Sequence, residues 1–129
     1  MTIGSLLFRI TAIAIFVQLL LGGLLTFDFI NAGVHILMGI VVFVLAIGSA
    51  IVSLVSKPEQ RSLQITSFVM VALIIGQMIL GLDTLDTGNQ VIAWIHFVNA
   101  IAIYSIALLG TFIALRSDQA NKVESVLVS

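Results

Sequence analysis

The sequence predicts an all-α integral membrane protein, an antiparallel bundle of four transmembrane helices built from a duplicated helical hairpin. Of its 129 residues, 60% are hydrophobic and 9% are charged, whereas soluble domains carry about 25% charged residues. The few charges separate four long uncharged stretches, and the polar residues inside these stretches repeat. A net charge of −1 without a run of like charges excludes a nucleic-acid-binding protein and a disordered tail.

Each uncharged stretch is near or above the roughly 20 apolar residues that cross a bilayer core. We expect transmembrane helices at about residues 7–27, 34–56, 63–82 and 92–115, and a tail at residues 116–129. Short connections favour an up-and-down bundle, so residues 1–129 are expected to form a single domain. Cysteine is absent, which removes disulfide frameworks, thiolate metal sites and iron–sulfur clusters from the possible functions.

The basic residues predict the orientation in the membrane. All five fall on one side of the expected spans, while the loops of the other side carry only acidic residues; the basic residues are Arg9, Lys57, Arg61, Arg116 and Lys122, and the acidic ones Asp28, Asp83 and Asp86. By the positive-inside rule, both termini of this multi-pass protein are cytoplasmic and the acidic loops face outward. We expect the membrane to be a prokaryotic plasma membrane.

An internal repeat places the polar residues of the spans. The segment Gln18-Leu-Leu-Leu-Gly22 matches Gln77-Met-Ile-Leu-Gly81 at a shift of 59 residues. After each segment come an outer loop, a histidine and a small residue four positions later, namely His35 with Gly39 and His96 with Ala100. We therefore expect two equivalent hairpins whose histidines lie at similar depth near the outer face.

Two facing imidazoles favour a haem over a zinc ion, because zinc requires four ligands or three and a water. A haem needs only two axial ligands from the protein. We predict His35 and His96 as iron ligands, with clearance for the cofactor provided by Gly22, Gly39, Gly81 and Ala100. The nearby amides Asn31 and Asn99 are candidates to orient the spare ring nitrogens. No Cys-x-x-Cys-His sequence is present, so the haem is expected to be non-covalent and of b type, or a related haem o or haem a.

The alternative interpretation is structural. His35 is then an interfacial residue and His96 a hydrogen-bonded core residue, while the glutamines and glycines serve helix packing. Trp94 fits an interfacial aromatic belt, and Tyr104 fits a packed position in either interpretation.

These motifs resemble one four-helix half of the haem A synthase family, over about residues 8–116. The resemblance implies that His35 and His96 are the axial ligands of one haem near the outer surface. The family's catalytic half has a carboxylate three residues before the first ligand and often a cysteine pair. Here that position is Ala32 and cysteine is absent. The chain therefore looks closer to the half that holds an auxiliary haem b.

Three functions remain open at this point. The first is an oxidoreductase that resembles haem A synthase and acts in haem A formation. The second is a non-enzymatic cytochrome b that transfers electrons in the membrane as a carrier or respiratory-complex subunit. The third is a haem-free membrane scaffold. The expected partners are haem and membrane lipid, and no nucleic acid. Candidate partners are a quinone, respiratory-complex subunits or a second copy of the chain in a homodimer.

Overall fold

The computed structural model describes residues 2–55 and 61–127. Within these ranges the chain is almost wholly helical and has no strand. Its elements are α1 (Ile3–Thr26), α2 (Ala32–Val55), α3 (Arg61–Thr87) and α4 (Gln90–Leu127). Ser56, the last residue of the second predicted span, and Lys57, in the predicted cytoplasmic loop, lie outside the described residues.

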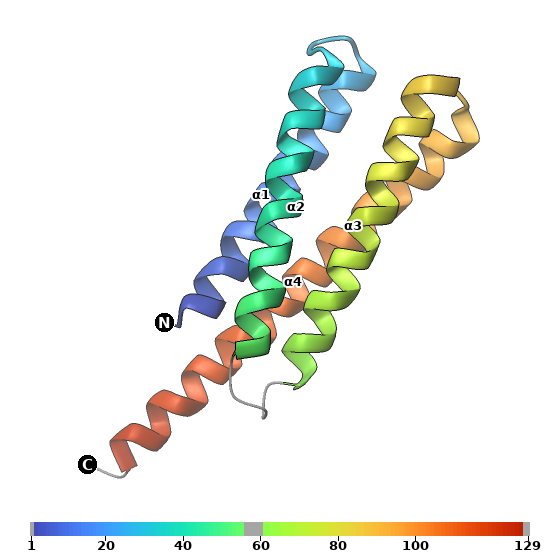
Figure 1. Ribbon diagram of the computed structural model, residues 1–129. Helices are drawn as coiled ribbons and strands as arrows, with labels where there is room; N and C mark the ends of the chain where they lie inside the picture. Colours follow the sequence, from blue (N-terminus) through green and yellow to red (C-terminus); the bar gives the residue numbers. More distant parts are fainter. Residues whose placement is uncertain (1, 56–60, 128–129) are drawn as a thin grey trace.

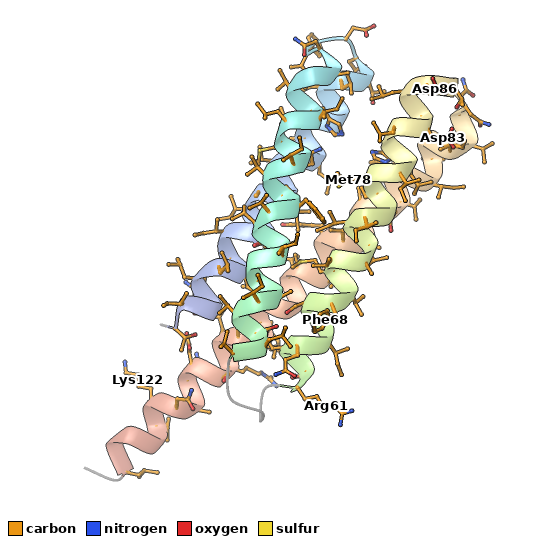
Figure 2. All side chains as sticks on the ribbon, in the orientation of Figure 1. Arg61, Phe68, Met78, Asp83, Asp86 and Lys122 are labelled. Carbon is orange, nitrogen blue, oxygen red and sulfur yellow. The ribbon has the colours of Figure 1, made fainter. Side chains whose placement is uncertain are left out.

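All four helices are long and apolar enough to cross a membrane. The connections α1–α2 and α3–α4 lie at one end, which we call the loop end, while the N-terminus lies towards the other, the terminal end (Figure 1). The charges are separated along the same axis. Figure 2 shows Asp83 and Asp86 at the loop end and Arg61 and Lys122 at the terminal end. This distribution agrees with the two-sided charge pattern of the sequence.

Two of the helices, α3 and α4, continue well past the predicted ends of their spans. The helix α3 continues through Asp83 and Asp86, which were expected in a loop, and stops at Thr87 because Gly88 adopts a left-handed backbone with φ 64°. The helix α4 continues through the expected tail to Leu127, since residues 116–127 contain neither glycine nor proline to end it. The α3–α4 connection is therefore two residues, 88–89, and is shorter than the connection 27–31.

Polar side chains cap the helices where they begin. The hydroxyl of Thr2 accepts from the backbone N–H of Ser5 at the start of α1. At the start of α2, Asn31 Oδ1 accepts from the N–H of Val34 at 3.1 Å. These caps satisfy backbone donors that have no partner within the helix.

The helices form a four-helix bundle in which each packs along two neighbours, in the order α1, α2, α3, α4 and back to α1. This arrangement places α2 and α4 at opposite corners, as do α1 and α3. Small residues allow the close approach. The ring of Phe8 is fully buried and lies directly against Gly110, so that any side chain at position 110 would meet it. Packing of this kind replaces the hydrophobic driving force between helices in lipid.

The buried core occupies only the terminal half of the bundle. Buried residues lie between positions 5 and 15 of α1, 42 and 53 of α2, 63 and 74 of α3, and 103 and 114 of α4. Hydroxyl groups in this half bond across helices, with Thr11 3.1 Å from Ser49 and Ser67 3.1 Å from Ser53. In the loop half, no residue of 16–26, 32–41, 75–87 or 90–102 is buried, and the α1–α2 and α3–α4 pairs diverge towards that end (Figure 1).

Candidate functional site

The two histidines of the chain meet in the loop half. His35 lies in the first turn of α2 and His96 in the second turn of α4, so the rings approach from opposite corners of the bundle. Their centroids are 6.3 Å apart and their planes are inclined by 63°. Both side chains are half-buried. The structure thus brings together the two residues that the sequence predicts as ligands.

Each imidazole is paired with a glutamine from the preceding helix. Gln18 Nε2 lies 3.2 Å from His35 Nε2 and also donates to the His35 carbonyl oxygen at 3.0 Å. In the second pair, Gln77 Nε2 lies 3.2 Å from His96 Nε2. Because an amide nitrogen only donates, Nε2 of each neutral imidazole accepts, and the ring proton is assigned to Nδ1.

The second pair has an additional support that the first lacks. Asn99 Nδ2 donates to the Leu73 carbonyl oxygen at 3.1 Å and to Gln77 Oε1 at 2.8 Å. These two bonds fix the orientation of the Gln77 amide and so of the nitrogen that faces His96. The residue three positions after His35 is Met38, which offers no comparable donor to Gln18.

Three polar atoms of this cluster are buried without a hydrogen-bond partner in the described part of the chain. They are Nδ1 of His35, Nδ1 of His96 and Oε1 of Gln18. A buried polar atom without a partner costs about 1–3 kcal/mol, and such atoms are uncommon enough to indicate a bound group or stored strain. Three of them beside two facing rings mark this cluster as the strongest candidate site in residues 2–55 and 61–127.

The small residues of the repeat lie against the site side chains. A Cβ atom at Gly22 would be 3.3 Å from Cε1 of His35, and one at Gly81 would be 2.9 Å from Cε1 of His96. At Gly39 a Cβ would be 3.3 Å from Nε2 of Gln18. These glycines therefore make room for the imidazoles and an amide. The sequence predicts instead that they make room for the cofactor. Ala100 is half-buried, one turn after the second histidine.

The two asparagines that were expected to orient the imidazole rings do not contact the ring nitrogens in the structure. Asn31, expected to orient a ring nitrogen, caps the start of α2 instead. Asn99 orients a glutamine and reaches the imidazole only through it. Gln18 and Gln77 are expected from the sequence only to serve helix packing, but in the structure they are the partners of the two imidazoles. The signal was present, because each glutamine precedes its glycine by four residues and therefore lies on the same helix face.

No carboxylate joins the histidines in the described residues. No group of three or more His, Cys, Asp or Glu side chains that could hold a metal ion occurs there. Asp28, Asp83 and Asp86 are exposed near the ends of the helices. The protein ligands that this cluster offers to a metal are therefore the two imidazoles, with Gln18 Oε1 as an additional polar atom.

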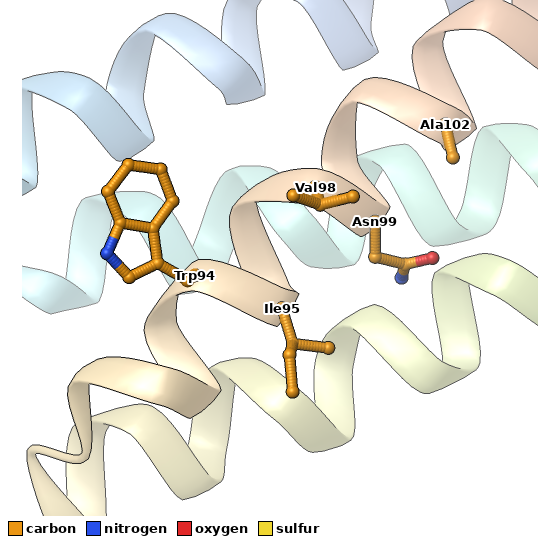
Figure 3. A pocket seen from close by; sticks show the side chains of 5 residues that line it. All are labelled: Trp94, Ile95, Val98, Asn99 and Ala102. Carbon is orange, nitrogen blue, oxygen red and sulfur yellow. The ribbon is translucent and has the colours of Figure 1, made fainter.

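A shallow hollow of about 380 Å³ lies beside the cluster on α4. Figure 3 shows its lining, Trp94, Ile95, Val98, Asn99 and Ala102. Asn99 is the residue that links this hollow to Gln77. The exposed Trp94 stacks edge-on against Phe97, with the ring centroids 6.1 Å apart.

Comparisons of the chain with protein-family models, with curated proteins and with solved structures find no match.

Proposed function

We propose that this protein is a b-type cytochrome of the membrane, which holds one non-covalent haem between His35 and His96 and transfers electrons. The observation that carries the proposal is the pair of facing imidazoles, each with a buried Nδ1 that lacks a protein partner. The residues fit the cofactor, because a haem supplies four nitrogens to its iron and takes two axial ligands from the protein. Either nitrogen of a neutral imidazole can bind a metal.

The ring separation is of the size that two axial ligands need. A metal ion bound to one nitrogen of each imidazole would hold the ring centroids roughly 6 Å apart, since each metal–nitrogen bond would be about 2 Å long. The centroids lie 6.3 Å apart. The absence of buried residues around them, in contrast to the terminal half, further supports a site for a large apolar group.

The glutamines lie next to the ring nitrogens that would not bind the iron. A ligating histidine keeps its second nitrogen hydrogen-bonded, which fixes the ring orientation. The amides of Gln18 and Gln77 lie 3.2 Å from that second nitrogen, Nε2, of His35 and His96. Ligation through Nδ1 places the ring proton on Nε2, where the neighbouring amide must present its oxygen; Gln18 Oε1 has no other partner. Asn99 holds Gln77 Oε1, so this oxygen could reach the His96 ring only after that bond is broken, and the two sides of the site are not equivalent.

Electron transfer is favoured over oxidation of a haem methyl group. When bound, haem supplies one-electron redox chemistry, and the protein sets its ligands and surroundings. A catalytic role would require an acid or base near the reacting group. Ala32 stands at the position where the haem A synthase family has a carboxylate, and the aspartates of this end are exposed. The resemblance to that family keeps haem A formation as the second candidate function.

We further infer that the bundle is antiparallel and arose by duplication of a hairpin. The inward-facing residues of α2 and α4 correspond at a constant shift of 61 positions, as His35 with His96, Gly39 with Ala100, Val42 with Ile103, Ala46 with Ala107, Ser49 with Gly110, and Ser53 with Ala114. The loop end carries no basic residue, which supports cytoplasmic termini and a haem near the outer face. Propionate groups of the haem would then meet water or the amides of Asn89 and Gln90.

The test is haem content in detergent-purified protein after reconstitution. Wild type should give a b-type reduced-minus-oxidised spectrum, and His35→Ala and His96→Ala should each lower the haem-to-protein ratio several-fold. Tyr104→Phe is the matched control, since Tyr104 contacts Phe16 outside the cluster, and it should leave the ratio unchanged. A wild type that takes up no haem would overturn the proposal and leave the scaffold function.

Mass analysis of the extracted haem separates the carrier from the enzyme. The protein is co-produced with a source of haem o for this purpose. Haem b alone supports the carrier, and a haem oxidised at the methyl group supports haem A formation instead.

A further inference from the structure

A second hollow, of about 300 Å³, runs along the seam between α1 and α4 in the terminal half. Arg9, Ile13 and Phe16 line it from α1, and Tyr104, Leu108 and Thr111 line it from α4. The two ends of each set are seven positions apart in the sequence, so the hollow is a groove about 10 Å long that follows the helix axes.

The groove has one cationic end and one apolar end. Arg9 lies beside Phe8, whose ring contacts Gly110, so Arg9 is level with Thr111 on α4. From there the groove runs towards the bilayer centre, where Phe16 and Tyr104 pack with their ring centroids 5.7 Å apart. Ile13 and Leu108 are exposed to the surroundings of the bundle.

Arg9 is the only charged residue of α1 and is half-buried. It has no hydrogen-bond or ion-pair partner among the residues that the structure describes. It also lies deeper than the other basic residue nearby, because Arg116 is five positions beyond Thr111, a distance of about 8 Å along the axis. An arginine at this depth requires an anion or access to water.

We infer that this groove binds one anionic phospholipid of the leaflet at the terminal end. Its phosphate pairs with the Arg9 guanidinium, whose planar fork suits phosphate oxygens, and one acyl chain lies along Ile13, Leu108 and Phe16. The polarity of the groove matches that of a lipid in this leaflet, with the headgroup at the surface and the chain towards the centre. Basic pockets between transmembrane helices are typical sites for such headgroups. This inference does not depend on the haem.

The test uses the full chain in detergent, with native mass spectrometry to count retained phosphatidylglycerol and phosphatidylcholine. Wild type should retain one phosphatidylglycerol in preference to phosphatidylcholine. Arg9→Gln should reduce this retention about tenfold, the effect of losing a charge-assisted hydrogen bond. The matched control is Arg116→Gln, because Arg116 stacks on Phe112, 4.5 Å from the ring centroid, outside the groove; retention should stay at the wild-type level.

A second variant tests the acyl-chain half of the groove. Leu108→Trp fills the hollow at an exposed position and keeps Arg9, and it should also reduce retention, while helix content and elution volume stay those of wild type. Equal losses in Arg9→Gln and Arg116→Gln would overturn the inference in favour of diffuse surface charge. Unchanged retention in Leu108→Trp, or displacement of the lipid by inorganic phosphate, would show a phosphate site without a lipid groove.

Discussion

Replacing Gly81 with alanine is expected to displace the His96 ring. The added Cβ would lie 2.9 Å from Cε1, 3.5 Å from Nδ1 and 3.7 Å from Nε2 of that ring. Ordinary contacts of a Cβ atom begin at 3.4 Å, so the ring or the helix must shift. Overpacking of this kind costs about 1–3 kcal/mol.

The matched control is Gly76→Ala, in the same helix. A Cβ at Gly76 meets nothing within 4 Å, so this variant shows only the gain of up to about 1 kcal/mol in helix propensity that both variants share. The difference between the two measures the ring contact alone. Gly22→Ala should be intermediate, because its Cβ would be 3.3 Å from the ring of His35.

Two measurements separate the contact from the proposed cofactor. Detergent-solubilised protein is unfolded thermally and followed by circular dichroism, and the haem-to-protein ratio is determined on the same samples. We expect Gly81→Ala to be the least stable of the three variants and to bind the least haem. Equal stability of Gly81→Ala and Gly76→Ala would refute the contact, whereas a loss of stability with full haem content would refute the role of this ring as a ligand.

The remaining predictions concern the terminal half. Gly110→Ala should destabilise the bundle by about 3 kcal/mol or more, because the new side chain meets the buried ring of Phe8. The control Gly23→Ala should not destabilise it, because a Cβ at Gly23 has nothing within 4 Å. Similar unfolding midpoints for the two variants would contradict this packing. The hydroxyl contact of 3.1 Å between Thr11 and Ser49 should give a coupling of about 0.6 kcal/mol in a double-mutant cycle of Thr11→Val and Ser49→Ala, and a coupling of zero would show that the two hydroxyls act independently.

The membrane spans could be predicted from the sequence because the signal is physical and local. Charged residues end apolar stretches wherever the chain returns to water, and the four helices follow these stretches. The ends of the helices could not be predicted as closely, because a helix with polar residues is tolerated at the membrane interface. In α3, the hydroxyls of Thr84 and Thr87 donate to carbonyl oxygens four residues back, and the helix passes through two aspartates without a loop.

The arrangement of the candidate site could be predicted in part. The repeat located His35 and His96, since equivalent positions in two hairpins reach the same depth. The residues that contact the two rings could not be predicted, because these contacts depend on how side chains of different helices meet. Spacing along the sequence gives no information on that geometry. Gln18 and Gln77 share a face with Gly22 and Gly81, yet only the packing of the helix pairs reveals that each amide reaches an imidazole.

The confinement of the core to one half has a consequence for assembly of the protein. Residues such as Phe8, Met70 and Ala107 are fully enclosed at the terminal end and can hold the helices together before the histidine end is complete. The proposed cofactor, a large planar molecule, could then enter between the helix pairs from the lipid without unfolding of the whole bundle. Amide hydrogens around residues 42–53 and 103–114 should accordingly exchange most slowly, and insertion of such a molecule should slow exchange chiefly around His35 and His96.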